Sequence, residues 1–151
     1  MPCISGNYNP SVGPLINIAI VQLKYVLPSN GVRSTAPPDV TMYTALMDTG
    51  ASSTCISQKV ADEVGLIAVG KTMMSGATGA KPVDQYGFGV GFVFNAKQNP
   101  SGTFTGDLNF RPVQGCVFDN HGFGFEVLLG RDILCSGAFT LSFDGHYILS
   151  I

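Results

Sequence analysis

The chain has 151 residues, of which 45% are hydrophobic, 12% are charged and 19 are glycine. This length fits one domain with a substantial core, and many glycines with few charges favour an all-β fold rich in turns. A formal charge of −2 gives no electrostatic basis for binding nucleic acid, and no apolar run reaches the ~20 residues that span a bilayer.

The N-terminal segment 1–14 is rich in Pro, Gly and Asn, so we expect it to be irregular and to precede a single domain over 15–151. The segment lacks the charged start and the apolar stretch of a secretory signal peptide. We therefore expect a cytoplasmic protein. The alternative is that a targeting or membrane segment lies outside this sequence.

The first half of the chain alternates apolar runs with turn signals. The run at 15–23 predicts a largely buried strand, and the run at 40–47 predicts a second strand that ends at Asp48. Between them, the stretch 28–39 contains three prolines and an Asn-Gly pair, which predicts a loop. The stretch 57–65 predicts a short helix, with a serine as its cap and a glycine as its stop.

The second half predicts strands and tight turns. Residues 71–86 predict a hairpin whose tip is made of small residues. Two further strands at the C-terminal end, 139–143 and 147–151, are joined by Asp144-Gly145-His146, a hairpin turn signal. The remaining predictions are strands at 87–94, 108–117 and 125–129, a polar loop at 95–106 and a short helix at 133–136.

The four cysteines show no CxxC pair and no histidine at metal-ligand spacing. Cys55 and Cys135 lie among apolar neighbours, so we interpret the cysteines as reduced structural thiols. A Cys–His nucleophile is the alternative, and it is disfavoured because both histidines lie in turns flanked by glycine. We predict no metal and no other cofactor.

Asp48-Thr49-Gly50 is the feature that points most directly to chemistry. An apolar run leads one carboxylate into a turn of small residues. Alone the triplet is a weak signal, because Asp and Gly favour turns and Asp48 could simply stabilise its own turn. A catalytic interpretation is favoured by the preceding apolar strand, by the small hydroxyl residues that follow, and by a later apolar run ending in Gly130-Arg131-Asp132.

Together these motifs resemble those of the retropepsin-like (retroviral-type, single-domain) aspartic proteases. Leu46 to Ala51 is similar to the family's catalytic motif, and Val127 to Leu134 to its apolar segment and Gly-Arg-Asn/Asp helix. Residues 138–143 are similar to its closing strand, and residues 71–86 occupy the place of its flap, the hairpin that covers the substrate. The resemblance implies an all-β, closed, barrel-like (half-pepsin) fold with one or two short helices.

The resemblance also implies an aspartic endopeptidase that acts as a homodimer. Each protomer would supply one Asp48, and the two carboxylates would activate a water molecule that hydrolyses a peptide bond. The sequence contains one Asp-Thr-Gly and no Asp-Ser-Gly, so one chain cannot supply both motifs. The expected partner is a peptide or protein substrate with apolar residues flanking the cleavage site. We expect no nucleic-acid partner and no membrane segment in this chain.

The resemblance assigns further roles around Asp48. Thr49 would bond across the dimer, Gly50 would let the substrate backbone approach closely, and Ala51 belongs to the same active-site turn. The expected flap and substrate-binding residues are Met73, Met74, Ser75, Gly76, Ala77, Thr78 and Gly79, and the expected structural residues near the site are Gly130, Arg131 and Asp132. A plain surface hairpin is the alternative for the flap.

The chain also departs from the family's pattern. Ser52 and Ser53 stand where retroviral enzymes commonly carry two aspartates, so the usual partner of Arg131 is missing. Its partner would be Asp132, Glu126 or a backbone carbonyl. The tail at 144–151 extends past the closing strand, and we expect it to widen the dimer sheet.

Two alternatives to the protease remain open from the sequence. One is a non-catalytic retropepsin-like module that dimerises or binds peptides, since a fold alone does not fix function. The other is a different all-β binding protein with a chance Asp-Thr-Gly, which the Gly-Arg-Asp segment disfavours.

Overall fold

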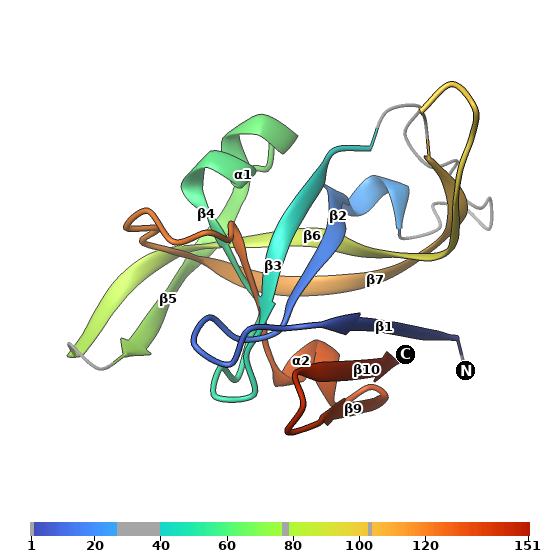
Figure 1. The fold of residues 1–151 in the computed structure, drawn as a ribbon. Helices are drawn as coiled ribbons and strands as arrows, with labels where there is room; N and C mark the ends of the chain where they lie inside the picture. The colour runs from blue at the N-terminus through green and yellow to red at the C-terminus, as the bar shows by residue number, and fades with distance from the viewer. Residues whose placement is uncertain (1, 27–39, 77–78, 103) are drawn as a thin grey trace.

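The computed structural model describes residues 2–26, 40–76, 79–102 and 104–151. In this part of the chain it contains ten strands, two short α-helices and one 3-10 turn (Figure 1). The strands are β1 Cys3–Asn7, β2 Leu15–Gln22, β3 Met42–Met47, β4 Cys55–Ser57, β5 Ala68–Gly76, β6 Gly79–Gln98, β7 Phe104–Phe118, β8 Val127–Leu129, β9 Ala138–Leu141 and β10 His146–Ser150. The helical elements are η1 Leu23–Tyr25, α1 Gln58–Val64 and α2 Arg131–Leu134. The predicted all-β class with one or two short helices is confirmed.

The main sheet closes on itself. Its strand order is β2-β3-β8-β4-β7-β6-β5, and β2 also pairs with β6. The strands from β2 to β6 in this order therefore form a ring, to which β5 adds as a flanking strand. In Figure 1, β6 and β7 run across the molecule as one long antiparallel pair. The closed, barrel-like architecture predicted from the sequence is confirmed.

The core fills the inside of this ring because its strands alternate inward and outward side chains. On β6, Phe88, Val90 and Phe92 are all buried. Ile18 on β2 and Leu129 on β8 are also fully buried and belong to the same core cluster. Burial of side chains of this size contributes about 1.5–3 kcal/mol each. The core thus fixes the ring on which the ends of β3 and β8 are placed.

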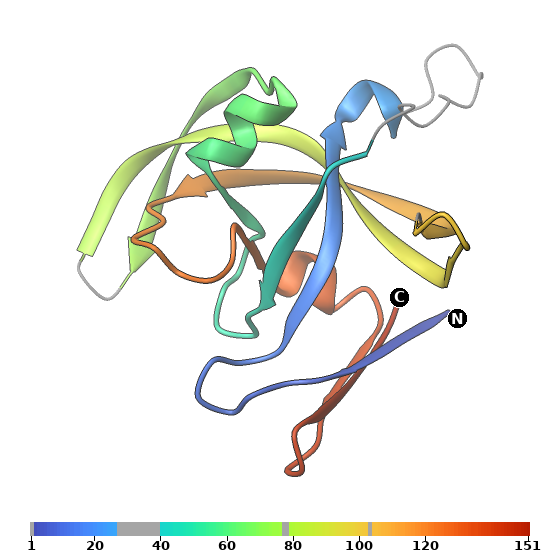
Figure 2. The same cartoon turned by 45° about the horizontal axis from the view of Figure 1, so that its top comes forward.

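A second, three-stranded sheet has the order β1-β10-β9 and lies beside the ring (Figure 2). The expectation that residues 1–14 are irregular is wrong for Cys3–Asn7, which pairs antiparallel with β10. This strand has no apolar run of its own, and its hydrogen-bond partners come from the other end of the chain. β10 is the middle strand, so the edges of this sheet are β1 and β9. The expectation that the tail at 144–151 widens a dimer sheet stays a prediction.

Several local predictions are confirmed with small shifts. Helix α1 has Ser57 as its N-cap, whose Oγ accepts a hydrogen bond from the backbone N–H of Val60 at 3.3 Å, and it ends at Gly65 with φ 69°. The loop expected at 95–106 is shorter, because β6 and β7 remain paired as far as Gln98 and Phe104. The loop expected at 28–39 lies outside the described residues.

The short strand β4 was not predicted. It has three residues, and its pairing with β7 and β8 holds it in the sheet. None of the helices in the described part of the chain is long and apolar enough to cross a membrane.

Candidate active site

Asp48 lies where β3 ends and the chain turns. Its backbone N–H donates to the carbonyl of Leu129 on the neighbouring strand β8 at 2.9 Å, which extends the β3–β8 pairing to the aspartate itself. The N–H of Gly50 donates to Asp48 Oδ1 at 2.8 Å, and the N–H of Ala51 donates to the Asp48 carbonyl at 3.2 Å. One carboxylate oxygen therefore holds the turn, while no described residue donates a hydrogen bond to the other.

The far end of this turn is held by Thr54 and Asp132. Thr54 is fully buried; its hydroxyl donates to Asp132 Oδ1 at 2.8 Å and its backbone N–H donates to Oδ2 at 2.9 Å. The N–H of Gly130 in turn donates to the Thr54 hydroxyl oxygen at 3.2 Å. Gly130 lies so close to the turn that a Cβ there would be 2.5 Å from the carbonyl carbon of Ser53.

Arg131 contributes two further bonds from the start of α2. Its backbone N–H donates to the carbonyl of Ala51 at 3.0 Å, and its Nη1 donates to the carbonyl of Thr49 at 3.0 Å. The side chain of Arg131 therefore has a backbone carbonyl as its partner, which is one of the three alternatives that the sequence left open. The Gly-Arg-Asp segment thus binds the Asp48 turn at several points within one chain, without an aspartate at position 52 or 53.

Asp48 and the β5–β6 hairpin line one cavity of about 530 Å³. In Figure 1 this hairpin extends at the left of the ring, away from the helix α1. The wall of the cavity also includes Cys55 on β4 and Cys116 on β7, which are paired residues of these two strands. Asp48 is the only acidic residue among the described residues that line this cavity.

The structure brings part of the predicted site together. The predicted residues that line the cavity are Asp48, Gly50, Ala51, Met73, Met74, Ser75 and Gly76. Those outside its lining are Thr49, Gly79, Gly130, Arg131 and Asp132. Arg131 and Asp132 nevertheless hydrogen-bond to the Asp48 turn from α2. Ala77 and Thr78 lie outside the described residues. The roles of the flap residues in substrate binding stay predictions.

The sequence matches the family of aspartyl proteases over residues 39–133, which includes the Asp48 turn and the Gly-Arg-Asp segment. The chain belongs to the aspartyl protease family. The predicted membership of an aspartic protease family is therefore confirmed. Among solved structures, the chain is similar to a retropepsin-like aspartic protease from Rickettsia conorii, with 17% identity, coverage of 97% of this chain and 89% of that chain, and a TM-score of 0.47. No curated protein sequence matches this chain.

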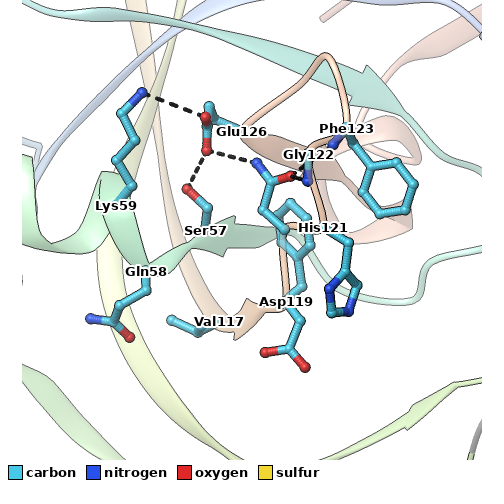
Figure 3. A pocket seen from close by; sticks show the side chains of 11 residues that line it. Ser57, Gln58, Lys59, Val117, Asp119, His121, Gly122, Phe123 and Glu126 are labelled. Carbon is cyan, nitrogen blue, oxygen red and sulfur yellow. Dashed lines mark hydrogen bonds and ion pairs between the residues drawn. The ribbon is translucent and has the colours of Figure 1, made fainter.

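The protein has a second and larger pocket, of about 740 Å³, which Asp48 does not line (Figure 3). Two carboxylates line it, Asp119, which is paired with Lys81, and Glu126. Glu126 accepts hydrogen bonds from Ser57 Oγ at 2.5 Å and Asn120 Nδ2 at 2.9 Å, and Lys59 Nζ lies 3.5 Å from its other oxygen. The bond from Ser57, followed by those from Asn120 and Lys59, lowers the pKa of Glu126. Both oxygens are engaged by the protein, so this carboxylate supports the α1 cap and is a poor candidate for catalysis.

Several residues of the candidate site were not found by sequence analysis. Thr54 carried no local signal, because its partner Asp132 lies 78 positions away in the sequence. Gln85, Gln114 and Phe118 line the cavity from β6 and β7. Only the pairing of these long strands places them near Asp48, so a prediction of the sheet order would have been needed to find them.

Proposed function

We propose that this aspartyl protease family member is an endopeptidase that acts as a homodimer and hydrolyses peptide bonds with a water molecule held between two Asp48 carboxylates. The observation that carries the proposal is the position of Asp48. Its carboxylate lies in a rigidly bonded turn and lines a cavity shared with a β-hairpin. The site therefore has a fixed acid and room for an extended peptide beside it.

The need for a second chain follows from the cavity's composition. Apart from Asp48, its described lining is neutral: small residues, methionines, cysteines, glutamines, Phe118 and Leu128. An aspartic protease needs two carboxylates, one to accept a proton from water and one to donate a proton to the carbonyl. A symmetric dimer places a residue opposite its own copy across the two-fold axis, and this would supply the second Asp48.

The proposed reaction follows from the electrostatics of such a pair. Two carboxylates about 3 Å apart cannot both ionise easily, so they share one proton, as documented for aspartic proteases as a class. The ionised Asp48 accepts a proton from the water, whose oxygen attacks the carbonyl carbon. The protonated Asp48 donates a hydrogen bond to the carbonyl oxygen, and the resulting diol collapses with cleavage of the C–N bond. Titration of the site belongs to the pair rather than to one residue.

The turn around Asp48 is suited to this task because it is held from several sides. The N–H of Gly50 fixes one carboxylate oxygen, and Arg131 and Asp132 bind the turn from α2. A carboxylate that is positioned before substrate arrives needs little reorganisation during the reaction. The free oxygen of Asp48 is the atom that would contact the water.

The β5–β6 hairpin would act as the cover of the peptide site. Met73 is 61% exposed, whereas Met74 packs against the apolar cluster of Cys55, Cys116 and Phe118. Apolar lining of this kind favours apolar substrate side chains, and closure of such a hairpin would exclude water from the reaction. This supports the proposed preference for apolar residues flanking the cleavage site.

The test is cleavage of a peptide library by the purified protein, beside Asp48→Asn, together with the mass of the native assembly. Asn keeps the shape of Asp but removes the charge. Cleavage by a dimer that is lost in Asp48→Asn supports the proposal. A dimer that cleaves nothing at any pH supports the non-catalytic module instead, and a stable monomer contradicts both.

A further inference from the structure

Two cysteines face one another in the wall of the Asp48 cavity. Cys55 on β4 and Cys116 on β7 are paired residues of neighbouring parallel strands. Their sulfur atoms are 3.2 Å apart, and both residues line the cavity although they are only 7% and 8% exposed. Neither thiol takes part in the chemical steps of the peptide hydrolysis proposed above.

We propose that Cys55 and Cys116 form a redox site, in which a peroxide converts the two thiols reversibly into a disulfide. Neighbouring strands lie about 4.8 Å apart, which falls within the range of Cα separations that a disulfide bridges, about 4.4–6.8 Å. The sulfur atoms already point toward one another, so the bond needs them to approach by about 1 Å to reach ~2.05 Å. No large movement of the backbone is required.

The surroundings distinguish the two thiols. The hydrogen bond between the two thiols lowers the pKa of Cys116, while the same contact together with burial raises the pKa of Cys55. The Cys55 thiol also has the carbonyl of Ser53 as an acceptor at 3.4 Å. Because the thiolate is the nucleophile, Cys116 is the residue expected to react first.

The chemistry balances with a hydroperoxide as the oxidant. The Cys116 thiolate attacks one peroxide oxygen, the O–O bond breaks, and the products are a sulfenic acid and hydroxide, which becomes water. The Cys55 sulfur then attacks the Cys116 sulfur; the S–S bond forms, the S–O bond breaks, and the leaving hydroxide takes the Cys55 proton as a second water. Two electrons pass from the thiols to the peroxide, and a dithiol reductant reverses the change.

The cavity gives the oxidant its route. A peroxide is small enough to enter the cavity that the two cysteines line. The bond would also join β4, which follows directly from the Asp48 turn, to β7. Oxidation would therefore change the wall of the cavity beside Asp48 without touching the aspartate.

The test uses a variant in which only this pair of cysteines remains, Cys3→Ser/Cys135→Ser. Both replaced residues are exposed and lie outside the cavity lining, so the variant removes intermolecular disulfides and leaves the pair intact. The folded variant is treated with hydrogen peroxide, and its remaining thiols are alkylated under denaturing conditions. The products are digested and identified by mass spectrometry, with and without dithiothreitol before alkylation.

The expected result is one linked pair of peptides containing Cys55 and Cys116, lighter by two hydrogen atoms and fully separated by dithiothreitol. The thermal midpoint should rise on oxidation, because the bond closes a loop between residues 61 positions apart. Adding Cys55→Ser to the same background should leave Cys116 as a sulfenic acid that dimedone traps. Two thiols that survive the peroxide, separate sulfinic acids at the two positions, or a lower thermal midpoint after oxidation would each overturn the proposal. None of these readouts depends on peptidase activity.

Discussion

Thr54 and Asp132 join the far end of the Asp48 turn to α2 within a single chain. The carboxylate of Asp132 accepts one hydrogen bond from the Thr54 hydroxyl at 2.8 Å and one from its backbone N–H at 2.9 Å. Thr54 is fully buried, so neither group has access to bulk water as a substitute. The turn that carries Asp48 is therefore fixed to α2 by a charged acceptor rather than by packing alone.

Replacement of Thr54 by valine should destabilise the protein. Valine keeps the shape but removes the hydroxyl, so Asp132 loses one donor and the Gly130 N–H loses its acceptor. Asp132 is exposed and water can replace its lost donor, so only the Gly130 N–H is left buried and unpaired. One such group costs about 1–3 kcal/mol, and we expect the free energy of unfolding to fall by about that amount. Urea denaturation measures the loss. Thr54→Ser keeps the hydroxyl and should lose clearly less; equal losses in the two variants would show that the hydrogen bonds are unimportant.

Alanine at Gly130 should be poorly tolerated. A Cβ at this position would lie 2.5–2.9 Å from the backbone atoms of Ser53, which cannot move without displacing the turn. Overpacking of this kind typically costs about 1–3 kcal/mol. Gly124→Ala is the matched control, because a Cβ there meets no atom within 4 Å. Thermal midpoints of the two variants give the comparison, and a Gly130→Ala protein as stable as Gly124→Ala would contradict the close approach.

Arg131 should matter more for catalysis than for stability. Its guanidinium donates to the Thr49 carbonyl at 3.0 Å, but the residue is exposed, so Arg131→Met should cost only about 0.5–1.5 kcal/mol. A misplaced turn beside the catalytic acid can nevertheless slow a reaction by roughly 10²-fold, so we expect kcat to fall by about tenfold or more. Arg131→Lys retains a donor and should recover part of kcat. An unchanged kcat in Arg131→Met would mean that the bond does not position the turn.

Glu126 should make stability depend on pH in the acidic range. Its pKa is lowered from 4.5 by the bonds from Ser57, Asn120 and Lys59, so the folded state favours the ionised form. The stabilisation is present above the pKa of the unfolded chain and is lost as pH falls through the lower folded-state value. Unfolding free energies measured from pH 6 downward should therefore decrease in the wild type and decrease less in Glu126→Gln. Parallel pH profiles for the two proteins would contradict this role.

Features that depend on local patterns could be predicted from the sequence. Helix α1 is an example, because Ser57 and Gly65 carry the start and stop signals within the segment itself. The strand that leads to Asp48 is another, since its apolar run ends at the aspartate. The same locality allowed the Asp-Thr-Gly and Gly-Arg-Asp motifs to be recognised.

Features that depend on remote pairing could not be predicted. Strands β1 and β4 are short and have no apolar pattern of their own, and their partners are distant in the sequence. The same holds for the bond from Thr54 to Asp132, which requires β3, β8 and α2 to be assembled first. The contact of Cys55 with Cys116 depends likewise on the pairing of β4 with β7.

The central claim is that each active site uses two Asp48 residues from two chains. It is tested most directly by unfolding wild type together with an equal amount of Asp48→Asn, refolding the mixture, and measuring peptide cleavage at constant total protein. Random pairing makes one quarter of the dimers fully wild type, so the account predicts one quarter of the wild-type activity. Half of the wild-type activity would show that each Asp48 works alone, and would contradict the claim.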